Sequence, residues 1–240
     1  MKNIYSLILI ILIMSCDDKP KVVFLGDSIT DAGLYDKNVG LNINDSIIYP
    51  KHTGFITLIK NELGNNKEFI GKGVSGDKVS DLLTRYNNDV IKLKPNIVFI
   101  YIGINDVWHK YDFGTGSDID FYERGLRTII SDIKNTGAKI VLCTPTVIGE
   151  NTGDFKLGNH FKDVETMEKM DADLDNFSDV IRNLSNEYET ELLDLRQIFT
   201  EYIKKNNPEN KPDSILTYDG VHLNDLGNRL IAEGMIEFLK

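Results

Sequence analysis

The chain has 240 residues, 41% of them hydrophobic, and carries a formal net charge of −10 at pH 7. This length and composition predict one globular domain with a sizeable core. The negative charge repels nucleic-acid backbones and anionic lipid headgroups, which disfavours both as general partners, but it is compatible with a locally neutral pocket for a small substrate.

Residues 1–15 have the pattern of a secretory signal. A lysine precedes the apolar run Ile4–Met14, which is too short to span a bilayer comfortably. The run leads to Cys16 and resembles the bacterial lipoprotein signal, in which the chain is cut before the cysteine and the thiol carries a diacylglycerol. We therefore expect lipidation at Cys16, a tether over 16–21 and a cell-envelope location, periplasmic or on the cell surface. The alternative, an uncleaved N-terminal anchor, also places the globular part outside the cytoplasm.

Residues 22–240 alternate between short apolar runs and amphipathic stretches, with no internal repeat or second domain. The runs predict strands over 22–25, 69–74, 97–102, 140–143 and 192–195. The amphipathic stretches predict helices over 53–64, 79–93, 120–135, 174–188, 196–204 and 226–239. This alternation implies right-handed crossovers and a parallel sheet covered on both faces, hence the α/β class.

Three polar segments fall outside this alternation, at 31–50, 108–116 and 147–163. We expect them to flank the site, the first as a long surface loop and the last as a flap. The remaining cysteine, Cys143, ends an apolar run and is predicted to be a buried small hydrophobe.

Ser28 follows the first strand in the turn Gly26-Asp27-Ser28, and open α/β sheets bind ligands at the carboxyl ends of their strands. An ordinary turn is the alternative, because all three residues favour turns. A serine nucleophile needs a base, and His222 lies three residues after Asp219, which can orient its ring. The sequence therefore contains candidates for a Ser–His–Asp triad.

Acyl transfer also needs donors for an oxyanion. Besides the Ser28 amide, the candidates are the amide of Gly76, after the second strand, and the side chain of Asn105, after the third. A turn glycine and a turn-forming asparagine are the alternatives. Of the other histidines, His109 is expected to border the pocket without doing chemistry. His52 and His160 are interpreted as surface or satisfied core residues.

Four blocks of the chain resemble those of the SGNH (GDSL) hydrolase family, in the same order. The blocks are Gly26-Asp27-Ser28-Ile29, Gly76-Asp77, Gly103-Ile104-Asn105-Asp106 and Asp219-Gly220-Val221-His222. The resemblance implies a flavodoxin-like three-layer α/β/α fold with a five-stranded parallel sheet. It also implies Ser28 as nucleophile, His222 as base held by Asp219, and Ser28, Gly76 and Asn105 as oxyanion donors. No metal or cofactor is implied.

The resemblance predicts a serine esterase that hydrolyses a short-chain acyl ester. A polar rim containing Trp108 and Tyr111 favours deacetylation of a carbohydrate over cleavage of a long acyl chain. A lysophospholipase or thioesterase acting on lipid-like esters is the enzymatic alternative, and a non-catalytic binding lipoprotein is the alternative from another class. A nucleotide-binding protein is disfavoured, because the first turn lacks the glycine-rich fingerprint and the phosphate-binding lysine. The sequence leaves the oligomeric state open.

Overall fold

A five-stranded parallel sheet forms the centre of the molecule. The computed structural model describes residues 19–38, 52–150, 164–209, 211 and 215–240. The strands lie in the order β2-β1-β3-β4-β5, and all neighbouring pairs are parallel. Their bounds are β1 Lys21–Gly26, β2 Glu68–Gly73, β3 Ile97–Tyr101, β4 Lys139–Cys143 and β5 Glu191–Leu193. The predicted α/β fold with a flavodoxin-like parallel sheet is confirmed.

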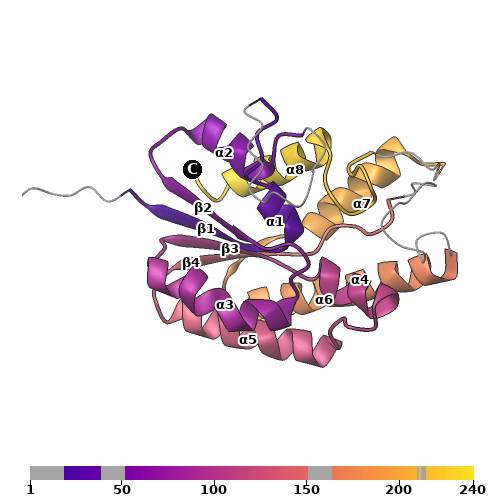
Figure 1. The fold of residues 1–240 in the computed structure, drawn as a ribbon, viewed down its shortest axis with the longest axis horizontal. Coiled ribbons are helices and arrows are strands. Elements are labelled where there is room, and N and C mark those ends of the chain that lie inside the picture. The colour runs from indigo at the N-terminus through magenta and orange to yellow at the C-terminus, as the bar shows by residue number, and fades with distance from the viewer. Residues whose placement is uncertain (1–18, 39–51, 151–163, 210, 212–214) are drawn as a thin grey trace, which may run out of the picture.

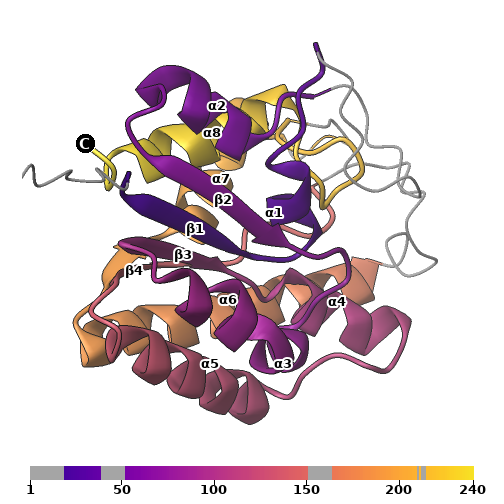
Figure 2. The ribbon, with the colours of Figure 1, turned by 60° about the vertical axis from the view of Figure 1, so that its left-hand side comes forward.

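Helices cover both faces of this sheet. Their bounds are α1 Ser28–Ala32, α2 Phe55–Leu63, α3 Val79–Asp89, α4 Ile104–Asp112, α5 Ile119–Lys134, α6 Val164–Tyr188, α7 Leu195–Asn206 and α8 Asp225–Ile236. Figures 1 and 2 show α1, α2, α7 and α8 on one face of the sheet and α3 to α6 on the other. The molecule is therefore the three-layer sandwich that the sequence predicts.

The core lies between the layers and is fullest along the central strands. Val22 and Val23 on β1 and Val98 on β3 are 0% exposed, as expected for strands covered on both faces. Phe24 is in register with Phe99, and their rings stack at 5.1 Å. The two strands that lead to α1 and α4 are therefore packed on both faces.

The structure differs from the predicted elements at several places. Helices α1 and α4 begin within residues interpreted as loops, and α6 starts at Val164 rather than at residue 174. The helix predicted over 79–93 ends at Asp89, and a short 3₁₀ turn, Ile91–Leu93, follows it. Among the helices described, none is both long and apolar enough to cross a membrane.

The predicted flap over 147–163 is wrong for its first residues. Val147, Ile148 and Glu150 are each at most 5% exposed, because this segment packs into the molecule after β4. Residues 151–163, which include His160, lie outside the described residues. The same holds for the predicted signal, for Cys16 and for residues 39–51 of the long loop.

Candidate active site

Ser28 is placed by a tight turn at the carboxyl end of β1. A Cβ atom at Gly26 would lie 2.4 Å from the carbonyl oxygen of Tyr101, so this strand end accepts only glycine. Asp27 caps α1, because its Oδ1 accepts the backbone N–H of Ile29 at 3.0 Å. Ser28 is the first residue of that helix and is 7% exposed. Its position is therefore fixed by the strand on one side and by the cap on the other.

Ser28, His222 and Asp219 form a continuous chain of contacts. The Oγ of Ser28 lies 2.9 Å from Nε2 of His222, and Nδ1 of His222 lies 2.8 Å from Oδ2 of Asp219. The other carboxylate oxygen of Asp219 accepts the backbone N–H groups of Val221 at 3.0 Å and of His222 at 2.7 Å. With the proton on Nδ1, the ring donates to Asp219 and accepts from the serine hydroxyl. The structure thus brings together all three residues predicted as a triad.

Gly76 occupies a turn between β2 and α3. The N–H of Asp77 donates to the carbonyl of Val74 at 3.2 Å, and φ of Gly76 is 84°. A positive φ at the third position of such a turn favours glycine. The side chain of Asn105, 2% exposed on α4, donates to the carbonyl of Asp77 at 3.0 Å. The turn that holds Gly76 is therefore joined directly to the first turn of α4, which holds Asn105.

Arg85, on α3, joins the residue after the Gly76 turn to the ends of β1 and β2. Its guanidinium donates to the carbonyl of Gly26 at 2.8 Å, to that of Lys72 at 3.0 Å and to the carboxylate of Asp77 at 2.6 Å. Sequence reasoning missed Arg85. The sequence alone shows only that Arg85 lies four residues before Asp89. This spacing predicts an ion pair on the helix, and the two side chains are in contact at 2.7 Å.

Two buried carboxyl groups support the same strand ends. Burial raises the pKa of Asp27 to about 7, and its Oδ2 has no hydrogen-bond partner among the described residues. Burial also raises the pKa of Asp106 to about 6, although this carboxyl accepts the N–H of Val79 at 3.1 Å. Asp106, the residue after Asn105, therefore fixes the start of α3.

His109 lies beside the Gly76 turn. A Cβ atom placed on Gly76 would be 3.9 Å from Cε1 of His109. Burial lowers the pKa of His109, which favours the neutral ring. Phe113 packs edge-on against that ring, with 5.0 Å between centroids.

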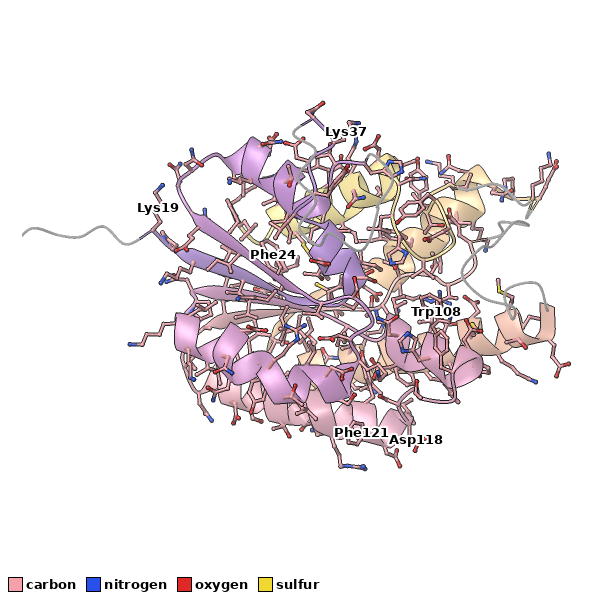
Figure 3. All side chains as sticks on the ribbon, in the orientation of Figure 1. Lys19, Phe24, Lys37, Trp108, Asp118 and Phe121 are labelled. Carbon is pink, nitrogen blue, oxygen red and sulfur yellow. The ribbon has the colours of Figure 1, made fainter. Side chains whose placement is uncertain are left out.

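The prediction that Trp108 stands on the rim is wrong. Trp108 is only 8% exposed, because α4 directs it into the core and its indole N–H donates to Asp112. Figure 3 shows Trp108 toward the end of the sheet opposite Lys19. Tyr111 donates its hydroxyl to Asp173 at 2.9 Å. Trp108 is therefore part of the core and does not form a sugar-binding rim.

Tyr218 and His52 extend the site beyond His222. The ring of Tyr218 lies parallel to that of His222, with 5.9 Å between centroids, and His52 lies parallel to Tyr218 at 5.5 Å. A small cavity of about 20 Å³ adjoins these rings and is also lined by Ile29 and Tyr35. The sequence does not predict that His52 lies next to Tyr218, because the two residues are far apart in the chain and meet only in the folded structure.

Cys143 is buried at the end of β4 as a free thiol, as its sequence context predicts. Burial raises its pKa well above the ordinary value, which keeps the thiol protonated and unreactive.

A model of the GDSL-like lipase/acylhydrolase family matches residues 24–230. Together with the relatives described next, this match identifies the class of protein as an ester-hydrolysing serine hydrolase. The chain belongs to the GDSL-like lipase/acylhydrolase family, which confirms the predicted membership.

Several proteins are similar to this chain over most of its length. An acetylxylan esterase of Geobacillus stearothermophilus is 30% identical over 224 residues, which cover 90% of this chain and 92% of the relative. The solved structure of the acetyl xylan esterase AlAXEase is 37% identical with a TM-score of 0.75, covering 92% of this chain and all of that one. The uncharacterized lipoprotein YqeF of Bacillus subtilis (strain 168) is 22% identical over 244 residues, covering 98% of this chain and 97% of YqeF.

The solved structure of Axe2, an acetylxylan esterase from Geobacillus stearothermophilus, is 27% identical with a TM-score of 0.67, covering 92% of this chain and 95% of that one. Further Axe2 structures are of catalytic mutants in which a serine, an aspartate or a histidine three residues after that aspartate is changed to alanine.

Proposed function

We propose that Ser28, His222 and Asp219 are the catalytic triad of this esterase and that its substrate is an acetylated carbohydrate. The observation that carries the proposal is the chain of contacts from Ser28 Oγ to His222 Nε2 at 2.9 Å and from His222 Nδ1 to Asp219 at 2.8 Å. This is the arrangement that activates a serine hydroxyl as a nucleophile. The aspartate and histidine replaced in the Axe2 catalytic mutants have the same three-residue spacing.

The geometry supports an acyl-enzyme mechanism. The Ser28 hydroxyl passes its proton to His222 as Oγ attacks the ester carbonyl carbon, and the amides of Ser28 and Gly76 with the side chain of Asn105 stabilise the oxyanion. His222 then returns the proton to the leaving alcohol as the ester bond breaks. His222 then deprotonates a water molecule that attacks the acyl-serine, and it returns this proton to Ser28 Oγ as the acyl–oxygen bond breaks and the acid is released. The sum is ester plus water to alcohol plus acid.

The named relatives support a small acyl group on a sugar. The relative from Geobacillus stearothermophilus and the solved structure AlAXEase are both named as acetylxylan esterases.

The substrate class is tested with purified enzyme on two series. We expect kcat/KM to be highest for acetyl esters among aryl esters of rising acyl length, and we expect acetate release from acetylated xylo-oligosaccharides. A fluorophosphonate probe is expected to label Ser28, which a non-catalytic binding lipoprotein would not allow. Activity that rises with acyl length would instead support the lysophospholipase or thioesterase alternative.

We also propose that Cys16 carries a lipid that anchors the domain outside the cytoplasm in the cell envelope. The supporting observations are the apolar run that leads to Cys16 and the similarity of nearly the whole chain to the lipoprotein YqeF. In a bacterial host, the wild-type protein is expected in the membrane fraction with an acylated Cys16. The Cys16→Ser variant is expected to lack the lipid, and an unmodified, soluble wild-type protein would contradict the anchor.

A further inference from the structure

Glu150 is a buried carboxylate that the mechanism above does not use. It follows β4 and is 4% exposed. Its Oε1 accepts the backbone N–H of Leu216 at 2.5 Å, and its Oε2 accepts the N–H of Thr217 at 2.5 Å and the hydroxyl of Thr217 at 2.6 Å. A buried carboxylate with three donors from one short segment fixes the position of that segment.

Thr217 connects Glu150 to the turn that holds Asp219 and His222. Its Oγ1 accepts the N–H of Gly220 at 3.1 Å, while the carbonyl of Gly220 accepts the N–H of Gly149 at 2.8 Å. Gly220 lies between Asp219 and His222, and its φ of 92° is one that other residues rarely adopt. Gly149 therefore holds Gly220 directly through its carbonyl, and Glu150 holds it indirectly through Thr217, which accepts the Gly220 N–H.

The triad geometry depends on the shape of this turn. Asp219 uses Oδ1 to accept the backbone N–H groups of Val221 and His222, which leaves Oδ2 for the imidazole. A change in the backbone around Gly220 would rotate Asp219 and the His222 ring together. It would lengthen the contact to Ser28, which comes from the opposite end of the described chain.

We propose that Glu150 is a positioning residue for the catalytic base, acting through Thr217 and Gly220 on Asp219 and His222. This inference rests on the proposed triad. A carboxylate is required because every group that faces its two oxygens is a donor. Glutamine would direct an amide N–H₂ toward a backbone N–H and leave one of them unsatisfied in a buried site.

The test compares Glu150→Gln and Glu150→Asp with wild type, using Glu233→Gln on the exposed face of α8 as the matched control. We expect Glu150→Gln to lower kcat about 10- to 100-fold, part of what a well-placed general base contributes, with little change in KM. Glu150→Asp retains the charge and is expected to restore part of the rate. The low-field proton signal of His222 Nδ1–H, assigned by its loss in His222→Ala, is expected to shift upfield in Glu150→Gln, whereas the control should match wild type.

A purely structural role would lower the melting temperature of Glu150→Gln but leave kcat per active site and the His222 signal unchanged, and that result would overturn the proposal. If Glu150→Gln does not fold, Thr217→Val decides, because it keeps Glu150 and removes the hydroxyl that reaches Gly220. A wild-type kcat in Thr217→Val would then reject the proposal, and a lowered kcat supports it. Full activity of Ser28→Ala would instead reject the proposed triad, so the two failures are distinguishable.

Discussion

The Ser28→Ala variant is expected to lose roughly 10⁴- to 10⁶-fold in kcat for an aryl acetate while remaining folded. The reason is that the variant has no nucleophile to form the acyl-enzyme, although the oxyanion donors and the pocket remain. The Ser28 side chain contacts His222 at 2.9 Å, so its loss removes one hydrogen bond and little apolar area. Steady-state kinetics and the melting temperature of the purified variant measure the two quantities.

Ser131→Ala is the matched control for this change. Ser131 lies on α5, and its hydroxyl donates to Tyr188 at 3.3 Å, away from the triad. We expect this control to retain the wild-type kcat and to be labelled at Ser28 by a fluorophosphonate probe. More than a tenth of wild-type activity in Ser28→Ala, with wild-type contamination excluded, would remove Ser28 from the nucleophile role.

The second large effect is expected from Asn105→Ala. Loss of one oxyanion donor lowers kcat by about 10²- to 10³-fold, because the donor acts where charge develops in the transition state. The Asn105 side chain donates one N–H to the carbonyl of Asp77 at 3.0 Å, which leaves its second N–H for the oxyanion. Since the ground-state ester carbonyl carries less charge, we expect KM to change little.

Asn88→Ala provides the comparison for Asn105→Ala. Asn88 is on α3, where it accepts a hydrogen bond from Lys92 at 2.7 Å on the exposed surface. Kinetics on both variants with the same aryl acetate separate a local effect from a general one. A loss that lies entirely in KM, or a loss smaller than about fivefold in kcat, would contradict an oxyanion role for Asn105.

The strands are the part of the fold that the sequence predicts best. The run that forms β3 is predicted within one residue, because its β-branched and aromatic side chains are covered on both faces. The triad is predictable for a different reason. Ser28, Gly76 and Asn105 each follow an apolar run, and parallel strands bring the ends of such runs to one edge of the sheet. Asp219 and His222 follow no strand, and it is their three-residue spacing that predicts the pair.

What the sequence does not predict depends on contacts between distant segments. The polar composition after Gly103 indicates a loop, yet it forms α4 and buries Trp108. In the sequence, Arg85 and Glu150 are ordinary charged residues. Their roles follow from contacts that only the folded chain makes, between Arg85 and Gly26 and between Glu150 and Thr217. His52 likewise becomes part of the site only through its stacking on Tyr218.

Ser28 and His222 lie 194 positions apart in the sequence, and this distance determines when the proposed triad can form during synthesis. With the proposed triad, a nascent polypeptide that still lacks the Asp219–His222 turn has the Ser28 hydroxyl but no base to activate it. Such a precursor would therefore be inert toward any ester inside the cell that makes it. Hydrolysis would begin only after synthesis has passed that turn and the chain has folded.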